Sequence, residues 1–213
     1  MPQPIPPRDA PFVRGETALL LVDMQRIWLD PVFDDHGAGG GPQDEFYRTT
    51  AAITVPACER LLAAARASGV EVLHTIIQSL TEDGRDRSLD HKMTPIHLAK
   101  SDDRALPVPS LMPAGDEILL PKTSSGVFNS TNIDYLLRNL GVRNLVICGI
   151  MTDQCVDMAV RDAADRGFVV AVPEDACFAA TRSRHDTALN AFGGYCWRTD
   201  TATICDRFQM LGA

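Results

Sequence analysis

Short, continuous apolar runs alternate along the chain with segments whose apolar residues recur every three or four positions. The runs are rich in Leu, Ile and Val, which is typical of strands buried on both faces of a sheet. Strands are therefore predicted over residues 17–23, 70–77, 117–122, 144–149, 168–172 and 199–204. The helical spacing predicts helices over residues 55–67, 132–139, 152–166 and 184–191.

This alternation of strands and helices predicts an α/β fold, with a mostly parallel six-stranded sheet covered by helices on both faces. Residues 1–16 are expected to form an N-terminal arm, and residues 17–213 a single domain that includes a glycine-rich loop at 37–42. The segment 78–115 is irregular, charged and rich in proline. Short helices and loops are expected there, long enough to form one wall of a substrate site.

Composition narrows the classes of function. The formal net charge of −8 gives the chain no general attraction to nucleic acids or anionic membranes. No apolar run approaches the ~18 residues that span a bilayer, and the polar N-terminus lacks the apolar segment of a signal peptide. The six cysteines form no C-x-x-C pair and no zinc-ligand spacing. We therefore expect a cytoplasmic protein with reduced thiols and no metal or other cofactor.

Three chemically active side chains follow predicted strands. Asp23 ends the first strand, Lys122 ends the third, and Cys155 lies in the first turn of the helix after the fourth. Because sites in parallel sheets lie beyond the carboxyl ends of the strands, these side chains are expected to lie close together. The helix N-terminus and Lys122 would favour a Cys155 thiolate, and a carboxylate at a strand end can serve as a general base.

Each of these residues also has a simpler interpretation. A cysteine on a helix is more often a buried core residue, as we expect for Cys148. Asp23 could cap a turn, and Lys122 could be a solvated surface residue. Their joint occurrence at three strand ends favours the catalytic interpretation, with Cys155 as the nucleophile.

Three segments resemble the signature segments of the isochorismatase-like cysteine hydrolases. They are Leu21-Val-Asp-Met-Gln25, Leu120-Pro-Lys-Thr-Ser-Ser-Gly-Val-Phe128 and Cys148-Gly-Ile-Met-Thr-Asp-Gln-Cys-Val156. The third segment is specific, whereas Asp-Met-Gln alone is not. The resemblance runs from about residue 17 to residue 204 and implies a Rossmann-like three-layer sandwich and an Asp–Lys–Cys triad, here Asp23, Lys122 and Cys155.

The resemblance also implies a mechanism. A non-proline cis peptide bond would join Ile150 and Met151, and the backbone N–H groups of Met151 and Cys155 would bind the oxyanion. Asp23 would take the thiol proton, Cys155 would attack a carbonyl carbon to form a thioester, and water would release the product. No metal is required, and members of the family often form homodimers or homotetramers.

Three branches of this family differ in their chemistry. Nicotinamidases carry an Asp-x-His metal segment after the second strand, whereas this chain has His74 followed by Thr75, with His91 and His97 isolated. Isochorismatases proper hydrolyse a vinyl ether without a cysteine nucleophile, which makes them an alternative that Cys155 disfavours. We therefore predict the third branch, which cleaves a C–N bond of a small amide, ureido or carbamoyl compound.

Candidate substrate contacts follow the same strand ends. Arg85 and Arg87 could bind a carboxylate of an anionic small-molecule substrate, although exposed arginines among acids are more often simple ion pairs. The other candidates for the lining of the pocket are Gln25, Trp28, Gln78, Phe128 and Asn129.

Two classes outside the family compete with this prediction. A phosphotransfer protein of the haloacid-dehalogenase or response-regulator kind also places an aspartate after its first strand, but the former requires Asp-x-Asp where this chain has Asp23-Met-Gln25. The other is a binding protein without catalysis, which an intact triad disfavours. A dinucleotide-binding protein is disfavoured because no G-x-G-x-x-G follows the first strand.

Overall fold

The fold is seen in a computed structural model that describes residues 5–36 and 44–212. The whole of the predicted glycine-rich loop and the first four residues of the predicted arm lie outside the described residues. The described strands form one sheet in the order β3-β2-β1-β4-β5-β7, with β6 paired to β4, and every pair of strands is parallel. The strands are β1 Thr17–Val22, β2 Glu71–Ile77, β3 Ile118–Lys122, β4 Asn144–Ile150, β5 Val169–Pro173, β6 Cys177–Phe178 and β7 Trp197–Thr199.

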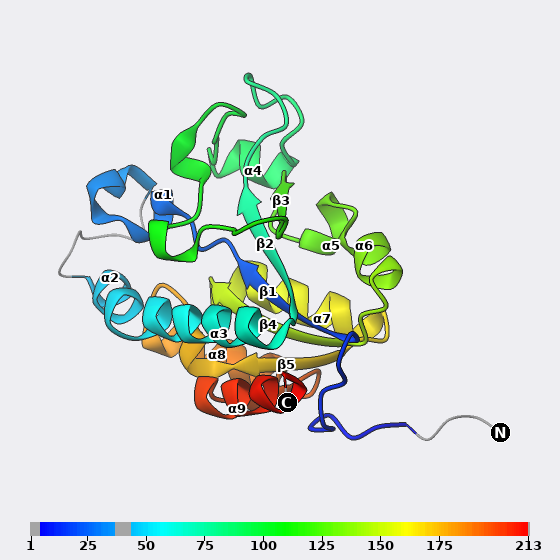
Figure 1. Cartoon of the computed structure of the whole chain (residues 1–213). Coiled ribbons are helices and arrows are strands. Elements are labelled where there is room, and N and C mark those ends of the chain that lie inside the picture. Colours follow the sequence, from blue (N-terminus) through cyan, green and yellow to red (C-terminus); the bar gives the residue numbers. More distant parts are fainter. Residues whose placement is uncertain (1–4, 37–43, 213) are drawn as a thin grey trace.

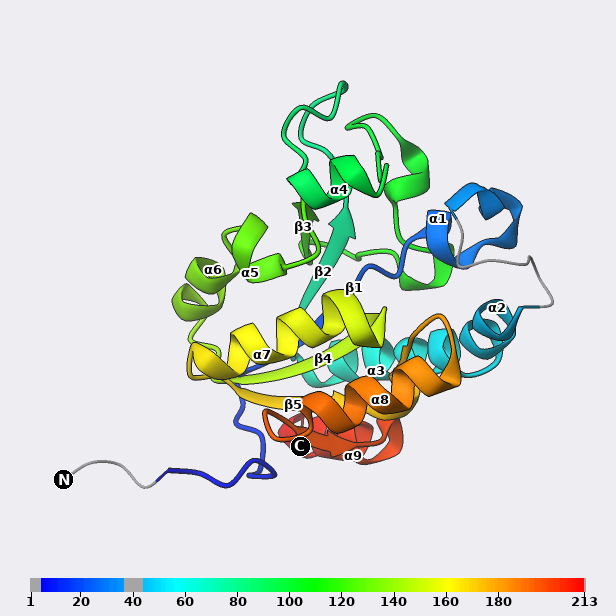
Figure 2. The same cartoon turned by 180° about the vertical axis from the view of Figure 1, so that it is seen from behind.

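Helices cover both faces of this sheet, as the alternation of elements predicts. Helices α3 and α9 pack together on one face, and α7 and α8 lie on the other (Figures 1 and 2). The α-helices are α1 Arg26–Leu29, α2 Glu45–Thr49, α3 Val55–Ser68, α4 Leu89–Met93, α5 Val127–Ser130, α6 Ile133–Asn139, α7 Asp157–Asp165, α8 Arg182–Phe192 and α9 Thr201–Gly212. No described helix is long and apolar enough to cross a membrane.

The central strands are buried on both faces. All side chains of β1 and β4 are buried, so the apolar runs of the sequence are the middle of the core. The register sets Val22 of β1 beside Gly149 of β4 and Thr75 of β2. Three chain segments therefore leave the sheet at neighbouring points of its carboxyl edge.

The predicted strand at 199–204 is wrong in most of its length. The edge strand is β7, which ends at Thr199, and α9 begins at Thr201. Asp200 caps this helix, because its Oδ1 accepts a hydrogen bond from Thr203 N at 2.7 Å. Ile204 and Phe208 lie four positions apart and are fully buried. Helical packing against α3 therefore overrides the β-rich local sequence.

The long connection between β2 and β3 rises beyond the carboxyl edge of the sheet (Figure 1). It contains α4 and two short 3-10 turns, Asp103–Ala105 and Pro109–Leu111. This agrees with the short helices and loops predicted for this segment, and it places the connection above the ends of β1 and β2.

At the other end of this connection, Glu117 accepts hydrogen bonds from the Arg66 guanidinium at 2.7 and 2.9 Å, and His74 Nε2 lies 3.2 Å away. The hydrogen bonds from Arg66 are the largest cause, and they lower the pKa of Glu117 to about 2 although burial opposes them. A carboxyl whose pKa is lowered by folding stabilises the fold above its unfolded pKa and loses that contribution as the pH falls through the folded pKa.

We therefore expect Glu117→Gln to lower the free energy of unfolding by about 1–2 kcal/mol at pH 7, the range for a hydrogen-bonded, partly exposed charge. The difference from the parent should shrink as the pH falls from about 4.5 towards 2, because both proteins then carry a neutral side chain. Urea unfolding at a series of pH values measures this difference in the free energy of unfolding. Glu16→Gln, at an ion pair whose two side chains are 39% and 71% exposed, is the control and should change little. A deficit independent of pH would contradict the assignment.

Candidate active site

Asp23 is the first residue beyond β1, and its backbone is held by β2. Its N–H donates to Thr75 O at 3.1 Å, and the Thr75 hydroxyl donates to Asp23 Oδ1 at 2.8 Å. The φ angle of Asp23 is +53°, a left-handed conformation that aspartate tolerates better than most residues. The chain thus turns sharply at Asp23, and the carboxylate is buried at the edge of the sheet.

Lys122, the last residue of β3, is fully buried against this carboxylate. Its Nζ lies 2.8 Å from Asp23 Oδ2 and donates to the carbonyl oxygens of Ser124 and Ser125, at 3.1 Å each. Burial alone would lower the pKa of Lys122, but the charge of Asp23 and the neighbouring Cys155 raise it above its usual value. Lys122 is therefore a permanent cation inside the protein.

The two oxygens of Asp23 have different surroundings. Oδ1 accepts the Thr75 hydrogen bond, whereas Oδ2 lies 2.8 Å from Lys122 Nζ as an ion pair. The Cys155 thiol also interacts with this carboxylate, and the interaction raises the pKa of the thiol. A buried carboxylate beside a thiol is suited to accept its proton.

Cys155 lies in the turn that joins β4 to α7. The peptide bond between Ile150 and Met151 is cis, and residues Thr152–Val156 form one π-helical turn in which Val156 N donates to Met151 O at 3.2 Å. Single π turns are frequent at functional sites. Lys122 Nζ donates to Cys155 Sγ at 3.3 Å, so the lysine contacts both the carboxylate and the thiol.

The resting form of Cys155 differs from the expected thiolate. Burial is the largest effect on this 4% exposed side chain and raises the pKa of Cys155 to about 12. Lys122 lowers the pKa in part, and Asp23 raises it again. Desolvation of the charged form thus outweighs the helix terminus and the lysine, and the thiol is neutral at pH 7.

Gly149 lets the two strands that carry Asp23 and Cys155 approach each other. Its φ is +123°, and a Cβ atom at this position would lie 2.1 Å from Val22 O. No side chain fits there, so β4 and β1 meet through their backbones next to the site.

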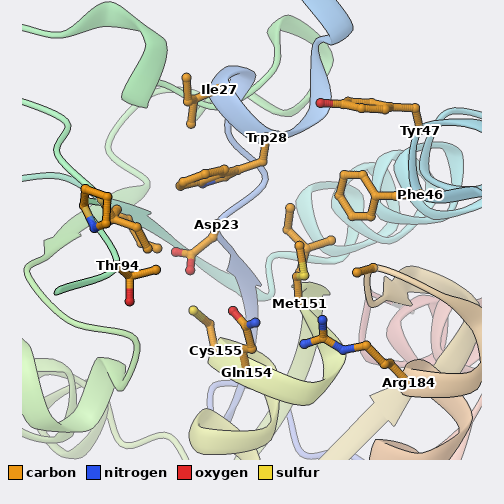
Figure 3. A pocket seen from close by; sticks show the side chains of 15 residues that line it. Asp23, Ile27, Trp28, Phe46, Tyr47, Thr94, Met151, Gln154, Cys155 and Arg184 are labelled. Atoms are coloured by element: carbon orange, nitrogen blue, oxygen red, sulfur yellow. The ribbon is translucent and has the colours of Figure 1, made fainter. Parts of the chain in front are cut away.

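A cavity of about 420 Å³ opens above Asp23 and Cys155. Figure 3 shows the Asp23 carboxylate and the Cys155 sulfur facing it, with Trp28 and Tyr47 on the opposite side. Asp23 and Arg184 are the charged side chains among the described residues that line it. The other lining residues are Ile27, Trp28, Phe46, Tyr47, Ile77, Thr94, Pro95, Ile96, Ile150, Met151, Gln154, Cys155 and Ala180.

Of the predicted substrate contacts, Trp28 lines this cavity, whereas Gln25 does not. Gln25 is fully buried, and its amide donates to the carbonyl oxygens of Ile77 and Ala105. Its Oε1 accepts from Ile77 N at 2.8 Å and from Trp28 Nε1 at 3.2 Å. All four bonds of the amide are made within the protein, so Gln25 fixes the wall that carries Trp28.

The remaining predicted contacts lie outside the cavity. Arg85 is 72% exposed and pairs with Asp83, and Arg87 donates to the carbonyl oxygens of Gly84 and Ile96. These arginines hold the loop that carries Ile96 rather than reaching the cavity. Gln78 donates to two backbone oxygens of the same connection, Phe128 is buried against Phe168, and Asn129 is exposed.

The cation that lines the cavity is Arg184, which is not among the residues predicted from the sequence. Arg184 lies on α8 and forms an ion pair with Asp153, in the π-helical turn that carries Cys155. The packing of α8 against the turn Thr152–Val156 decides that Arg184, and not Arg182, faces the cavity. The local sequence therefore does not distinguish the two arginines. Among the described residues no group of three or more His, Cys, Asp or Glu is placed to hold a metal ion.

Comparison with known proteins identifies the family of this chain. A model of the isochorismatase domain matches residues 17–203. The chain belongs to the isochorismatase-like cysteine hydrolase family. This family assignment decides against a phosphotransfer protein and confirms the resemblance seen in the three sequence segments.

One sequence relative and two solved structures match most of the chain. The ureidoacrylate amidohydrolase RutB of Agrobacterium fabrum is 32% identical over 199 residues, which are 83% of this chain and 82% of the relative. The crystal structure of a cysteine hydrolase from Pseudomonas syringae has a TM-score of 0.82 at 24% identity, over 95% of this chain and 96% of that one. The N-carbamoylsarcosine amidase of Thermoplasma acidophilum has a TM-score of 0.68 at 24% identity, over 87% and 96%. The last two show a shared fold.

Proposed function

We propose that this protein is a metal-independent cysteine amidohydrolase that cleaves a C–N bond of a small amide, ureido or carbamoyl compound. The contact of the buried Lys122 with both Asp23 and Cys155, which line the cavity, carries this proposal. A relative named as an amidohydrolase of ureidoacrylate supports the choice of bond.

The proposed reaction begins from a neutral thiol. Asp23 Oδ2 accepts the Cys155 proton as the sulfur attacks the carbonyl carbon, so the thiolate exists only as the new C–S bond forms. Lys122 stabilises the negative charge that passes between these two residues. Because free N–H groups lie at the start of a helical turn, the amides of Met151 and Cys155 are proposed to bind the oxyanion.

The C–N bond then breaks, and the proton held by Asp23 goes to the departing ammonia or amine. The acyl group remains on Cys155 as a thioester. Water, deprotonated by Asp23, attacks this thioester, releases the carboxylic or carbamic acid and returns the proton to the sulfur. Each half of the reaction moves one proton to and from the same carboxylate.

A screen for ammonia release tests the proposed function. It covers ureido acids, carbamoyl amino acids, biuret-like compounds and simple amides, with and without a chelator, and compares the parent with Cys155→Ala. Release that requires Cys155 and ignores the chelator supports the proposal. Loss of activity with the chelator would contradict metal independence. Hydrolysis of a vinyl ether that persists in Cys155→Ala would support the isochorismatase alternative instead.

The lining of the cavity narrows the proposed substrate to a compound with an apolar body and an acidic group. Apolar and aromatic side chains form most of the wall, and Arg184 is the described cation that faces the cavity. Asp153 already pairs with Arg184, so the guanidinium is held in place before a substrate arrives. This replaces Arg85 and Arg87 as the proposed carboxylate contact.

Arg184→Ala is therefore expected to raise KM for acidic substrates about tenfold or more, the range for a hydrogen bond to a charged group. KM for a neutral amide of the same size should change much less, and the ratio of the two values is the measurement. Arg182→Ala is the matched control, since Arg182 is 64% exposed, pairs with Asp186 and lies outside this cavity. An equal change for acidic and neutral substrates would exclude a carboxylate contact at Arg184.

A further inference from the structure

Two successive residues of α8 contact two successive residues of the π-helical turn Thr152–Val156, which carries Cys155. Arg184 pairs with Asp153 near the surface, and His185 Nδ1 lies 2.8 Å from Thr152 Oγ1 in the interior. The first contact is between side chains that are 47% and 19% exposed, whereas His185 and Thr152 are 2% and 0% exposed. The buried contact is the less adaptable of the two.

Several contacts fix the His185 ring. It lies 5.4 Å from the Phe178 ring, centroid to centroid, and its helix begins with a Thr181 side chain that accepts a hydrogen bond from Arg184 N. Burial lowers the pKa of His185, so the ring is neutral at pH 7 and has one donor nitrogen and one acceptor nitrogen. Because the plane of the neutral ring is fixed, Nδ1 can form its single hydrogen bond only along one direction, which is the direction of Thr152 Oγ1.

Thr152 links the His185 ring to Cys155, because it accepts or donates the hydrogen bond with His185 and belongs to the same turn as Cys155. It begins the π-helical turn and directly follows Met151, whose carbonyl oxygen accepts from Gln154 N and Val156 N. Cys155 lies between those two donors. A rotation of the backbone at Thr152 would therefore move the Cys155 sulfur relative to Lys122.

We propose that His185 is a positioning residue for the reaction: through the Thr152 hydroxyl it sets the orientation of the turn in which Cys155 Sγ meets Lys122 Nζ. This rests on the proposed function only in treating Cys155 as the nucleophile. A buried neutral hydrogen bond contributes little net stability compared with an apolar pair of the same shape. What it contributes is one defined geometry, because any other arrangement leaves two buried polar atoms without partners.

A second buried threonine, Thr54, provides a control for Thr152. Thr54 is also a fully buried threonine, but its hydroxyl has no hydrogen-bond partner among the described residues. Replacing Thr54 by valine removes a buried hydroxyl without removing a hydrogen bond. It therefore separates the effect of the Thr152–His185 bond from the effect of changing any buried threonine.

The test measures the rate at which iodoacetamide alkylates Cys155 as a function of pH, followed by peptide mass spectrometry. A Cys205→Ser background is used, because Cys205 is the partly exposed thiol in this chain. Alkylation needs no substrate, so the result does not depend on which C–N bond, if any, the protein cleaves. Thermal denaturation of every variant confirms that the fold is intact.

Thr152→Val and His185→Leu are expected to change the alkylation rate at a given pH by about threefold to tenfold, in line with the loss of one hydrogen bond. The double variant should differ from the parent no more than either single variant, because both changes remove the same bond. Thr152→Ser and His185→Asn retain a hydroxyl or an amide at the bonding position and should keep the parent profile, as should Thr54→Val.

Parent-like profiles in both Thr152→Val and His185→Leu would overturn the proposal, even if their melting temperatures fell, since the bond would then be structural only. Additive effects in the double variant would also overturn it, because the two side chains would then act separately. Two variants on opposite sides of one bond keep the test valid if either fails to fold.

Discussion

Cys155→Ala is expected to lower the rate of C–N hydrolysis by at least about 10³-fold, because the proposed covalent intermediate forms on the sulfur that this change removes. The fold should persist, since the change removes one sulfur atom at the edge of a cavity and leaves the Lys122–Asp23 ion pair in place. Ammonia release and thermal denaturation measure the two effects separately.

Cys148→Ala is the matched control for this prediction. Cys148 is fully buried in β4, and its Sγ lies 3.8 Å from Leu20 O, away from the lining of the cavity. Its replacement should cost roughly 1–2 kcal/mol of stability through the lost atom and retain most of the activity. Full turnover by Cys155→Ala, or a comparable loss in Cys148→Ala, would contradict the assignment of the nucleophile.

Lys122→Met is expected to have the largest effect on stability. Removing one partner of a buried ion pair leaves the other charge without compensation, which costs about 3–5 kcal/mol. Activity should also be lost, because the same ammonium group contacts the carboxylate and the thiol. Urea unfolding gives the stability, and Lys92→Met, at a surface lysine, should change it by less than about 0.5 kcal/mol.

The double variant Asp23→Asn/Lys122→Met tests the coupling between these two residues. Removing both charges should recover part of the stability lost in Lys122→Met, because no unpaired ion is left in the interior. Activity should not return, since the proton acceptor is also gone. Stability losses that simply add would show that the two charges do not depend on each other.

The sequence predicted which side chains lie close together where a strand delivers a residue directly. Asp23 and Lys122 each follow a buried apolar run, and the parallel topology brings such ends together. Arg184 and Thr94 also line the cavity, but tertiary packing decides where their segments lie. Their local sequence therefore does not indicate that they belong to the site. The cluster of charged residues around Arg85 was visible in the sequence, but these side chains form ion pairs and hydrogen bonds within their own loop.

Two further differences have the same physical origin. The β-rich residues Thr201 to Ile204 are helical because α9 packs on α3, which a local propensity does not include. The thiol of Cys155 is neutral because burial outweighs nearby charges, and the degree of burial cannot be read from the spacing of residues. Tertiary contacts decided both cases.

The parts of the cavity have separate origins in the chain. Segments at the strand ends supply Asp23 and Cys155, with Lys122 buried against both, whereas Trp28, Tyr47 and Ile96 come from connecting segments outside the sheet. Substitutions in those segments leave the backbone contact between β1 and β4 untouched. The protein is thus a suitable starting point for directed evolution of amidase selectivity, with a small library at these three wall positions and with Asp23, Lys122 and Cys155 held constant.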